Sequence, residues 1–504
     1  MVQLRDYQAT TLEQIKDAFC DGLRRLMVQM PTGAGKTKLA AQMVEGARAK
    51  SKRIIFEVPQ ISLVDQTVEA FSAEGMGSEI GVIQAKHALT DWSRPIQVAS
   101  VQTLQMMEGY PKCDVVLRDE AHKMFTFDNR WMVDPAWANI PQIGLSATPW
   151  SKGLGKLYQR LIVSTTTTEL IARGYLVPFR VFAPTRPDLS KVRTVAGDYA
   201  LNDLAEVMNK SKLVADIVET WKQMAENRPT ICFCVDRAHA MSLKERFDAA
   251  GVPAGYMDCK TKPKDRKDIR NAFKAGAIKV VCNVDIVGVG IDWPEIACIS
   301  YCRPTKSEMR FVQNVGRGLR PASGKKDLLI LDHSDTHLRL GYVTDINHAT
   351  LDGARVVAHN PATAARLPKA CPKCNFVKPF GVRLCSQCGH ETVAPPPVKE
   401  YTAAQLAEFN GKKHRDKASA QTWDKPQRAM FYAELKRWGI EFNKKPGWAY
   451  MKYKARFEGA APDRDIEDVA PALGVSHATR NWIKKENIAY WKRMQKHGGD
   501  HHAS

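Results

Sequence analysis

A glycine-rich segment early in the chain has the composition of a phosphate-binding loop. It reads Met-Pro-Thr-Gly-Ala-Gly-Lys-Thr and lies between an expected strand and an expected helix. Glycines let backbone N–H groups point at phosphates, the lysine gives a charge to the β and γ phosphates, and the last hydroxyl can hold Mg²⁺. A chance turn is the alternative, and Met30 stands where the strict pattern has Gly, but the context favours a site for ATP and Mg²⁺. The residues expected at the nucleotide are Thr32, Gly33, Gly35, Lys36 and Thr37, with Thr37 also a ligand of Mg²⁺.

Two adjacent carboxylates, Asp119 and Glu120, follow an apolar run that has the composition of a buried strand. Because successive side chains of a strand point to opposite sides, the two are expected to diverge. Asp119 can then hold Mg²⁺ while Glu120 addresses the attacking water. Most adjacent acids are only surface charge, but a place at a strand end after the lysine loop favours the catalytic interpretation.

Four of the twelve cysteines form two CxxC pairs, Cys371 with Cys374 and Cys385 with Cys388. Two such pairs can supply the four thiolates of a tetrahedral Zn²⁺ site. A redox dithiol is the alternative for a single pair, but the duplication favours zinc. Four protein ligands leave no open position, so the expected role is structural. His390 lies close enough in the sequence to replace one ligand.

The elements that must position these groups form two successive α/β units. Apolar runs alternate with helical patterns over residues 20–150 and again over 228–335, which predicts two parallel sheets covered on both faces. The expected strands are 26–29, 53–58, 96–99, 114–117 and 142–145, then 230–234, 279–283, 297–301 and 327–331, and the expected helices include 38–49, 61–71, 238–250 and 265–275. The expected domains are 1–165, a connection at 166–215, 216–360, a zinc ribbon at 366–392, a proline-rich linker at 393–400, and a basic, aromatic-rich, mostly α-helical domain at 401–504.

Length and composition limit the class of protein to which the chain can belong. The chain has 504 residues, 44% of them hydrophobic and 25% charged, which indicates a soluble globular protein too long for one core. The net charge of +20 favours polyanions or is simply a solvated basic surface. No apolar run reaches the roughly 20 residues that span a bilayer. The N-terminus lacks the layout of a secretory signal, so we expect a cytoplasmic protein without a membrane partner.

The last part of the chain is basic and rich in aromatic residues. From Val398 onward, 21 Lys and Arg face 13 Asp and Glu, and 14 aromatic residues occur. Aromatic rings can stack on bases while cations meet phosphates, or the rings can form the core of a small helical domain. Both interpretations stay open, as does docking of a protein partner. The aromatic residues concerned include Trp438, Trp448, Tyr450, Tyr453 and Phe457.

The run at 119–122, Asp-Glu-Ala-His, resembles the DEAH box of superfamily-2 helicases, and the other motifs of that family occur in order. Residues 4–8 resemble the N-terminal element in which the glutamine, here Gln8, reads adenine. Segments 58–60 and 100–103 resemble motifs that contact the nucleic-acid strand. Residues 146–148 resemble motif III, which links hydrolysis to movement.

The second α/β unit carries two further resemblances. Residues 283–292 resemble motif V, and residues 313–320 resemble motif VI. In the family, two arginines of motif VI reach across the cleft to the γ-phosphate as arginine fingers. The resemblance therefore implies further residues at the nucleotide, namely Gly290, Asp292, Gln313, Arg317 and Arg320.

Segments 169–178 and 331–333 narrow the resemblance to bacterial and phage repair helicases of the RadD type, which are related to the helicase subunits of restriction enzymes. The resemblance covers about residues 1–390. It implies two tandem RecA-like domains with ATP between them and a nucleic acid, DNA rather than RNA, as the track. It further implies a role in DNA repair, recombination or replication in a bacterial cell or an infected host cell. An RNA helicase and a nucleotide-switched binding module remain as alternatives.

Overall fold

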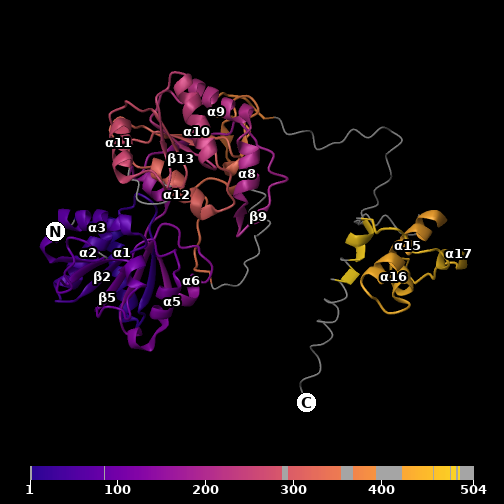
Figure 1. Ribbon diagram of the computed structural model, residues 1–504, viewed down its shortest axis with the longest axis horizontal. Coiled ribbons are helices and arrows are strands. Elements are labelled where there is room, and N and C mark those ends of the chain that lie inside the picture. The colour runs from indigo at the N-terminus through magenta and orange to yellow at the C-terminus, as the bar shows by residue number, and fades with distance from the viewer. Residues whose placement is uncertain are drawn as a thin grey trace, which may run out of the picture. The chain divides into compact units, whose positions relative to one another are not determined.

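The computed structural model contains two parallel β-sheets with their helices, then a small antiparallel module and a helical C-terminal unit (Figure 1). It describes residues 3–84, 86–285, 293–352, 367–392, 423–457, 459–476, 478–483 and 486–487. The chain divides into two compact units, Met1–Pro395 and Pro396–Ser504. Both sheets and the cysteine module belong to the first unit.

The first sheet has seven strands in the order β3-β4-β2-β5-β6-β1-β7, all paired in parallel. Its strands are β1 (Arg25–Gln29), β2 (Ile54–Val58), β3 (Ile80–Ile83), β4 (Ile96–Ser100), β5 (Val115–Arg118), β6 (Gln142–Ser146) and β7 (Arg160–Val163). Its helices are α1 (Asp6–Cys20), α2 (Lys36–Arg48), α3 (Val64–Ala73), α4 (Val101–Leu104), α5 (Thr126–Val133) and α6 (Leu154–Leu157). Because parallel crossovers are right-handed and this strand order reverses direction, the connecting helices lie on both faces.

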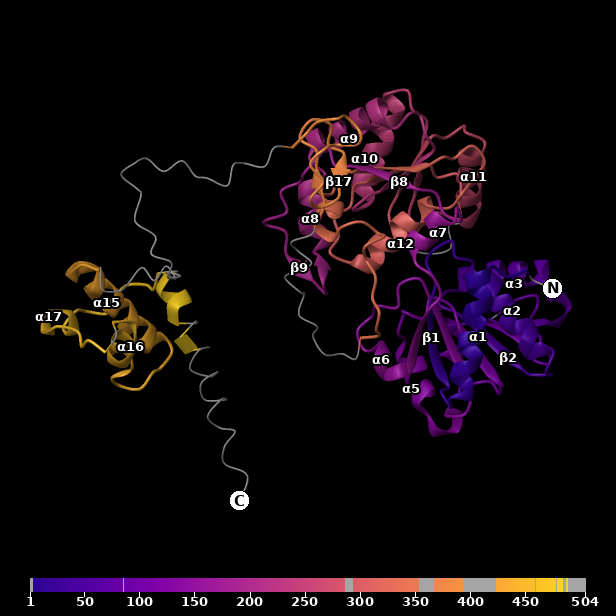
Figure 2. The ribbon, with the colours of Figure 1, turned by 180° about the vertical axis from the view of Figure 1, so that it is seen from behind.

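The second sheet has six strands in the order β12-β13-β11-β14-β15-β8, again all parallel. Its strands are β8 (Phe179–Phe182), β11 (Thr230–Phe233), β12 (Ala254–Met257), β13 (Val280–Asn283), β14 (Cys298–Tyr301) and β15 (Leu328–Asp332). Helix α7 (Thr167–Ala172) lies between the two domains in the sequence. The helices of the second domain are α8 (Leu201–Met208), α9 (Ser211–Met224), α10 (Arg237–Ala249), α11 (Pro263–Lys274), α12 (Glu308–Gly318) and α13 (Thr336–Leu340). Seen from behind, α12 lies on the side of this domain that faces the first (Figure 2). A small hairpin, β9 (Thr194–Val195) with β10 (Asp198–Tyr199), precedes α8.

Every strand expected from an apolar run forms, with ends within one residue of those expected. The sheets have four additional strands, β3, β7, β8 and β12, and these are the four edges of the two sheets. Each has only four residues, and each contains a glycine or an arginine, as in IGVI, RLIV, FRVF and AGYM. Central strands are buried on both faces and appear as continuous apolar runs, whereas β7 and β8 are only partly buried, and β3 and β12 are short runs interrupted by glycine. Of the four edge strands, β8 comes from the stretch expected to be only a connection.

The cysteine module lies against that same edge strand. It contains a short antiparallel pair, β16 (Lys369–Ala370) and β17 (Val377–Lys378). Phe376 forms a β-bridge with Phe182 at the end of β8, and the Ala183 N–H donates to the Asn375 carbonyl at 2.9 Å. The Tyr342 hydroxyl donates to the Val377 carbonyl at 2.7 Å. The module therefore covers part of an edge that would otherwise expose unpaired backbone groups.

The described part of the C-terminal unit is helical, with α15 (Lys425–Glu441), α16 (Trp448–Arg456) and α17 (Arg464–Glu467). Its core includes Phe431, Leu435, Tyr453 and Phe457. Trp438 and Trp448 pack against this core while partly exposed. These aromatic residues therefore contribute to the fold of the unit, as the core alternative expects. Across the residues that the structure describes, no helix combines the length and apolar character needed to cross a bilayer.

Candidate active site

The phosphate-binding loop joins the end of β1 to the start of α2. Gly33 and Gly35 have φ values of +86° and +82°, in the left-handed region that favours glycine. A Cβ on Gly35 would lie 2.5 Å from Nε2 of Gln8, and a Cβ on Gly33 would lie 2.8 Å from Cδ2 of Leu176. Only glycine therefore allows the loop to close in front of the N-terminus of a 13-residue helix. Such a cradle fits an anionic triphosphate.

Lys36 lies directly between the loop and the paired acids. Its Nζ is 3.0 Å from Oε1 of Glu120 and 4.0 Å from Oδ1 of Asp119. Burial alone would lower the pKa of Lys36, but the two carboxylates outweigh it and raise that pKa above its ordinary value. Burial would likewise raise the pKa of Glu120, yet Lys36 and His122 hold it well below its usual range. Burial dominates at Asp119 and raises its pKa.

The two carboxylates do not diverge as strand alternation predicted. Strand β5 ends at Arg118, and Glu120 has a left-handed φ of +47°. The Glu120 N–H donates to Oδ1 of Asp119 at 2.9 Å, so the chain turns back and both acids face one ammonium group. The rule of alternating sides applies only while the strand continues. Both acids still lie at the loop lysine, as the sequence predicted.

A chain of polar contacts leads from these acids into the second domain. His122 Nδ1 is 3.3 Å from Oε2 of Glu120 and 2.9 Å from Oγ of Ser146. Ser146 Oγ also accepts the Thr148 N–H at 3.0 Å. Gln313, on α12 of the second domain, donates its side-chain N–H to Oγ1 of Thr148 at 2.8 Å and lies 3.3 Å from Nε2 of His122. The acid pair and motif VI are therefore joined through His122 directly, and also through His122, Ser146 and Thr148 in turn.

Helix α12 is seated on the phosphate loop. A Cβ on Gly316 would lie 3.0 Å from Cβ of Thr32, and a Cβ on Gly33 would lie 3.6 Å from Cγ of Arg320. Arg317 lies close enough to Lys36 for its positive charge to lower the pKa of Lys36. The structure thus brings the two expected arginines to the loop that they were expected to complete. Gly290 and Asp292, also expected here, lie outside the described residues.

Gln8 is placed against the loop rather than in open space. It is 1% exposed, and its side-chain amide donates to the carbonyls of Ala34 and Gly35 at 3.0 and 3.2 Å. Its side-chain oxygen accepts the Arg5 N–H at 2.9 Å. In this state Gln8 braces the loop, and the reading of adenine stays a prediction.

Two residues of the site were not singled out from the sequence. Leu176 contacts Gly33, and Tyr175 stacks under the Arg5 guanidinium at 3.9 Å and meets the Tyr7 ring edge-on at 6.0 Å. Both belong to the stretch 169–178, which resembled the family as a whole without a role for any one residue. The Leu176 side chain reaches the loop, and that of Tyr175 reaches Arg5 and Tyr7, because the connection folds back over the first domain.

The segments expected to contact a nucleic-acid strand lie side by side. They follow β2 and β4, which are neighbours in the sheet. The Gln102 side chain donates to the Pro59 carbonyl at 2.8 Å, and Ser100 caps α4 by accepting the Thr103 N–H. The carboxyl ends of parallel strands meet at one edge, so both segments are presented on one surface.

The four cysteines form a candidate zinc site. Their sulfur atoms all lie within 4.8 Å of one another, with Cys371 to Cys388 and Cys374 to Cys385 both at 3.7 Å. Tetrahedral Zn²⁺ with Zn–S bonds of about 2.3 Å needs sulfurs about 3.8 Å apart, so the donor set fits. Burial would raise the pKa of the Cys371 thiol, but the N–H groups of Cys374 and Lys373 outweigh it and bring that pKa to about 6.

The two halves of the cysteine module repeat one hydrogen-bond pattern. The Cys371 N–H donates to the Phe376 carbonyl, and the Cys385 N–H donates to the His390 carbonyl. Asn375 and Gly389, each four residues after the first cysteine of a pair, have left-handed φ values of +59° and +68°. Among the described residues the metal-binding group comprises the cysteines and not the side chain of His390.

Two family models match the two sheet-bearing parts of the first unit. Residues 1–151 match the family described as type III restriction enzyme, res subunit, and residues 209–322 match the helicase conserved C-terminal domain. The 51.5 kDa protein of Lactococcus phage (isolate 7-9) is 25% identical over 487 residues, covering 92% of this chain and 100% of the phage protein.

A protein of Saccharomyces cerevisiae described as a proposed ATP-dependent helicase, IRC3, is 29% identical to this chain over 351 residues. The match covers 65% of this chain and 51% of the yeast protein, so the chain spans about half the length of that relative. A structure from Vibrio vulnificus YJ016, described as a fragment of a proposed HsdR subunit of a type I restriction enzyme, has a TM-score of 0.52 at 20% identity and covers 69% of this chain and 66% of that one. At that identity the likeness shows the fold alone. The chain therefore contains the two domains of a superfamily-2 helicase, a ResIII domain followed by a helicase C-terminal domain.

Proposed function

We propose that this chain couples ATP hydrolysis in the interdomain cleft to movement along DNA, or to its remodelling. The observation that carries the proposal is the seating of α12 on the phosphate loop, with Gly316 against Thr32 and Gln313 bonded to Thr148. Loop and helix belong to different domains. A change at the nucleotide therefore alters how the domains meet, which is what a stepping motor requires.

The roles of the side chains follow from their places. ATP entering the loop competes for Lys36, which is now held by Glu120 at 3.0 Å, so Lys36 turns to the phosphates and Glu120 is released to orient water. Thr37 and Asp119 would hold Mg²⁺, which would neutralise charge on the phosphates when bound. Arg317 and Arg320 supply positive charge from the opposite wall. An arginine in this role is worth roughly 10³–10⁵ in rate in related phosphoryl transfers.

DNA is the proposed track for two reasons. The first domain matches the family described as type III restriction enzyme, res subunit, and restriction enzymes act on DNA. The net charge of +20 favours a polyanion. The segments after β2 and β4 form a surface on which a strand backbone would lie.

We further propose a repair, recombination or replication role of the RadD type in a bacterial cell or an infected host. The cysteine module would hold structural Zn²⁺ and so fix the edge of the second sheet. The C-terminal unit would serve as an accessory DNA-binding or partner-docking domain. The domain boundaries proposed from the sequence are kept, except that β8 (Phe179–Phe182) is assigned to the second domain because it pairs with β15.

The test is steady-state ATP turnover with single-stranded, duplex and forked DNA, and with RNA, at several salt concentrations. We expect stimulation by DNA that exceeds stimulation by RNA and weakens as salt rises. Lys36→Ala should abolish turnover. Greater stimulation by RNA would assign the track to RNA, and slow turnover that no nucleic acid stimulates would indicate a switch instead of a motor. Wild-type turnover by Lys36→Ala would remove the site assignment.

A further inference from the structure

Lys325 lies in the short segment between motif VI and β15, where the proposed mechanism gives it no role. Its Nζ is 2.6 Å from the Gly318 carbonyl, 2.7 Å from the Arg320 carbonyl and 3.1 Å from the Pro294 carbonyl. An ammonium group has three N–H donors, so the three carbonyls match it in number. Burial, and after it the charge of Arg320, lower the pKa of Lys325 to about 8, so the ammonium form prevails at neutral pH.

The three carbonyls belong to two parts of the site. Gly318 ends α12, and Arg320 follows it after one residue, so these are carbonyls without intrahelical partners at a helix C-terminus. A cation there also interacts favourably with the helix dipole. Pro294 follows Asp292, of motif V, by two residues. One side chain therefore ties the end of motif VI to Pro294, which follows motif V in the sequence.

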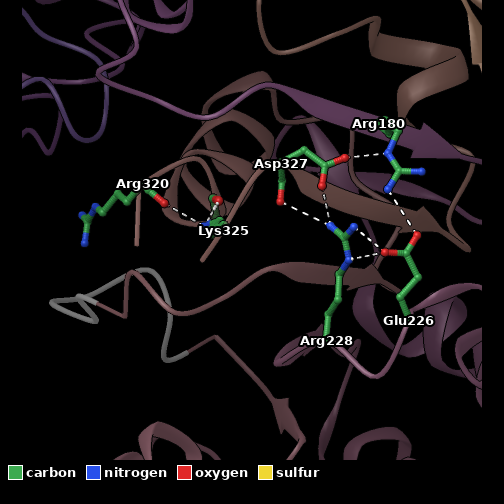
Figure 3. Close-up of polar contacts among 7 residues, drawn as sticks. Arg180, Glu226, Arg228, Arg320, Lys325 and Asp327 are labelled. Carbon is green, nitrogen blue, oxygen red and sulfur yellow. Dashed lines mark hydrogen bonds and ion pairs between the residues drawn. The ribbon is translucent and has the colours of Figure 1, made fainter. Parts of the chain in front are cut away.

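The Arg320 side chain leaves this anchor in the opposite direction. Figure 3 shows the Arg320 main-chain oxygen bonded to Lys325 while the guanidinium extends away from it. Near the start of that side chain, the Arg320 Cγ lies 3.6 Å from where a Cβ on Gly33 would stand, so the side chain passes the phosphate loop. The position of its main chain therefore sets how far the charge reaches.

The segment that carries Lys325 is itself held firmly. Asp327, two residues further, is ion-paired to both Arg180 on β8 and Arg228 before β11, and Glu226 bridges the same two arginines (Figure 3). A cavity of about 640 Å³ lies beside this network, lined among others by Lys325 and Glu295. Ion pairs fix one end of the segment to the sheet, so Lys325 acts from a rigid base.

We propose that Lys325 is a positioning residue, which holds the main chain at Arg320 so that this arginine reaches the phosphate loop. This inference rests on the proposed function, in which Arg320 supplies charge to the γ-phosphate. A displacement of about 1 Å at a catalytic group can cost on the order of 10²-fold in rate. The expected loss on removal of the ammonium group is therefore about 10-fold to 100-fold in kcat.

The test is a double-mutant cycle on the full-length protein. Lys325→Met keeps an unbranched side chain of nearly the same length and removes its donors. It should lower kcat while the KM for ATP changes by less than about threefold. Arg320→Ala should lower kcat by more. If Lys325 acts through Arg320, the double variant should be no slower than Arg320→Ala alone. Lys325→Arg should recover part of the lost kcat, and Lys326→Ala, at the exposed neighbour, should have wild-type turnover.

Two outcomes overturn the inference while leaving the motor in place. The first is a double variant whose kcat is lower than that of Arg320→Ala by the same factor by which Lys325→Met alone lowers kcat. Two independent substitutions multiply in this way, so the result would show that Lys325 does not act through Arg320. The other is wild-type kcat in Lys325→Met. A thermal unfolding scan of each variant separates mispositioning from loss of fold, since a folded Lys325→Met with lowered kcat supports the proposal. Wild-type turnover by Arg320→Ala contradicts the function on which the inference rests.

Discussion

Substitution of Gly316 by alanine should affect the stability of the fold and the rate of ATP turnover in opposite directions. Gly316 lies within α12, where glycine is less favourable than alanine by about 1 kcal/mol, so Gly316→Ala should stabilise the helix itself. The added Cβ, however, would lie 3.0 Å from Cβ and 3.1 Å from Oγ1 of Thr32, on the other domain. The loop must then move by a few tenths of an ångström for the cleft to close as it does here.

The cost falls on the closed cleft alone. Overpacking by one methyl group costs about 1–3 kcal/mol, which corresponds to about a 5-fold to 150-fold smaller closed population. We therefore expect Gly316→Ala to lower kcat within that range while the melting temperature stays equal or rises. The assay is DNA-stimulated ATP turnover at saturating ATP, read beside thermal unfolding of the same sample.

Gly46→Ala is the matched control. Gly46 also lies within a helix, α2, but a Cβ there would meet no atom within 4 Å. It should give the same gain in helix stability and leave kcat unchanged. Gly316→Ala with kcat within twofold of the wild type would show that contact between α12 and the loop does not limit the cycle, and the reasoning from the seated helix would be wrong.

Four further results are expected. Glu120→Gln should abolish ATP turnover while DNA binding, followed by fluorescence anisotropy, survives; turnover at the wild-type rate would exclude Glu120 as the group that acts on water. Fresh protein should contain about one equivalent of zinc by metal analysis, and less than about half an equivalent would count against the site. The Cys374→Ser variant should lose the zinc, and its β8 amides should exchange hydrogen faster. His239 and His333 are buried, and burial lowers the pKa of each to about 4. Because the unfolded chain then binds more protons than the folded one between pH 6.5 and 4, the urea midpoint should fall as the pH drops through that window, and a flat profile across it would contradict the burial. Deletion of residues 398–504 should weaken DNA affinity and its salt dependence if the C-terminal unit binds DNA directly; unchanged affinity would leave partner docking as its role.

Sequence alone predicted the central framework of both domains. Central strands such as β2 and β4 are buried along their whole length, so their apolar runs are visible without a structure. The phosphate loop and the two CxxC pairs are local in sequence, and local spacing fixes their chemistry. Strand β7 was missed because its exposed Arg160 breaks the apolar run, and β3 was missed although it is buried, because it has only four residues and one of them is glycine.

Only the tertiary structure decided which distant groups meet. The turn after Arg118 brings Asp119 and Glu120 to one ammonium, although alternation predicted divergence, because the strand ends before the acids. The contacts of Gln313 with Thr148 and of Lys325 with Pro294 join residues far apart in the chain. Sequence spacing determines what a short segment can bind, whereas the packing of two separate sheets determines which segments share a cleft, and no local pattern contains that information.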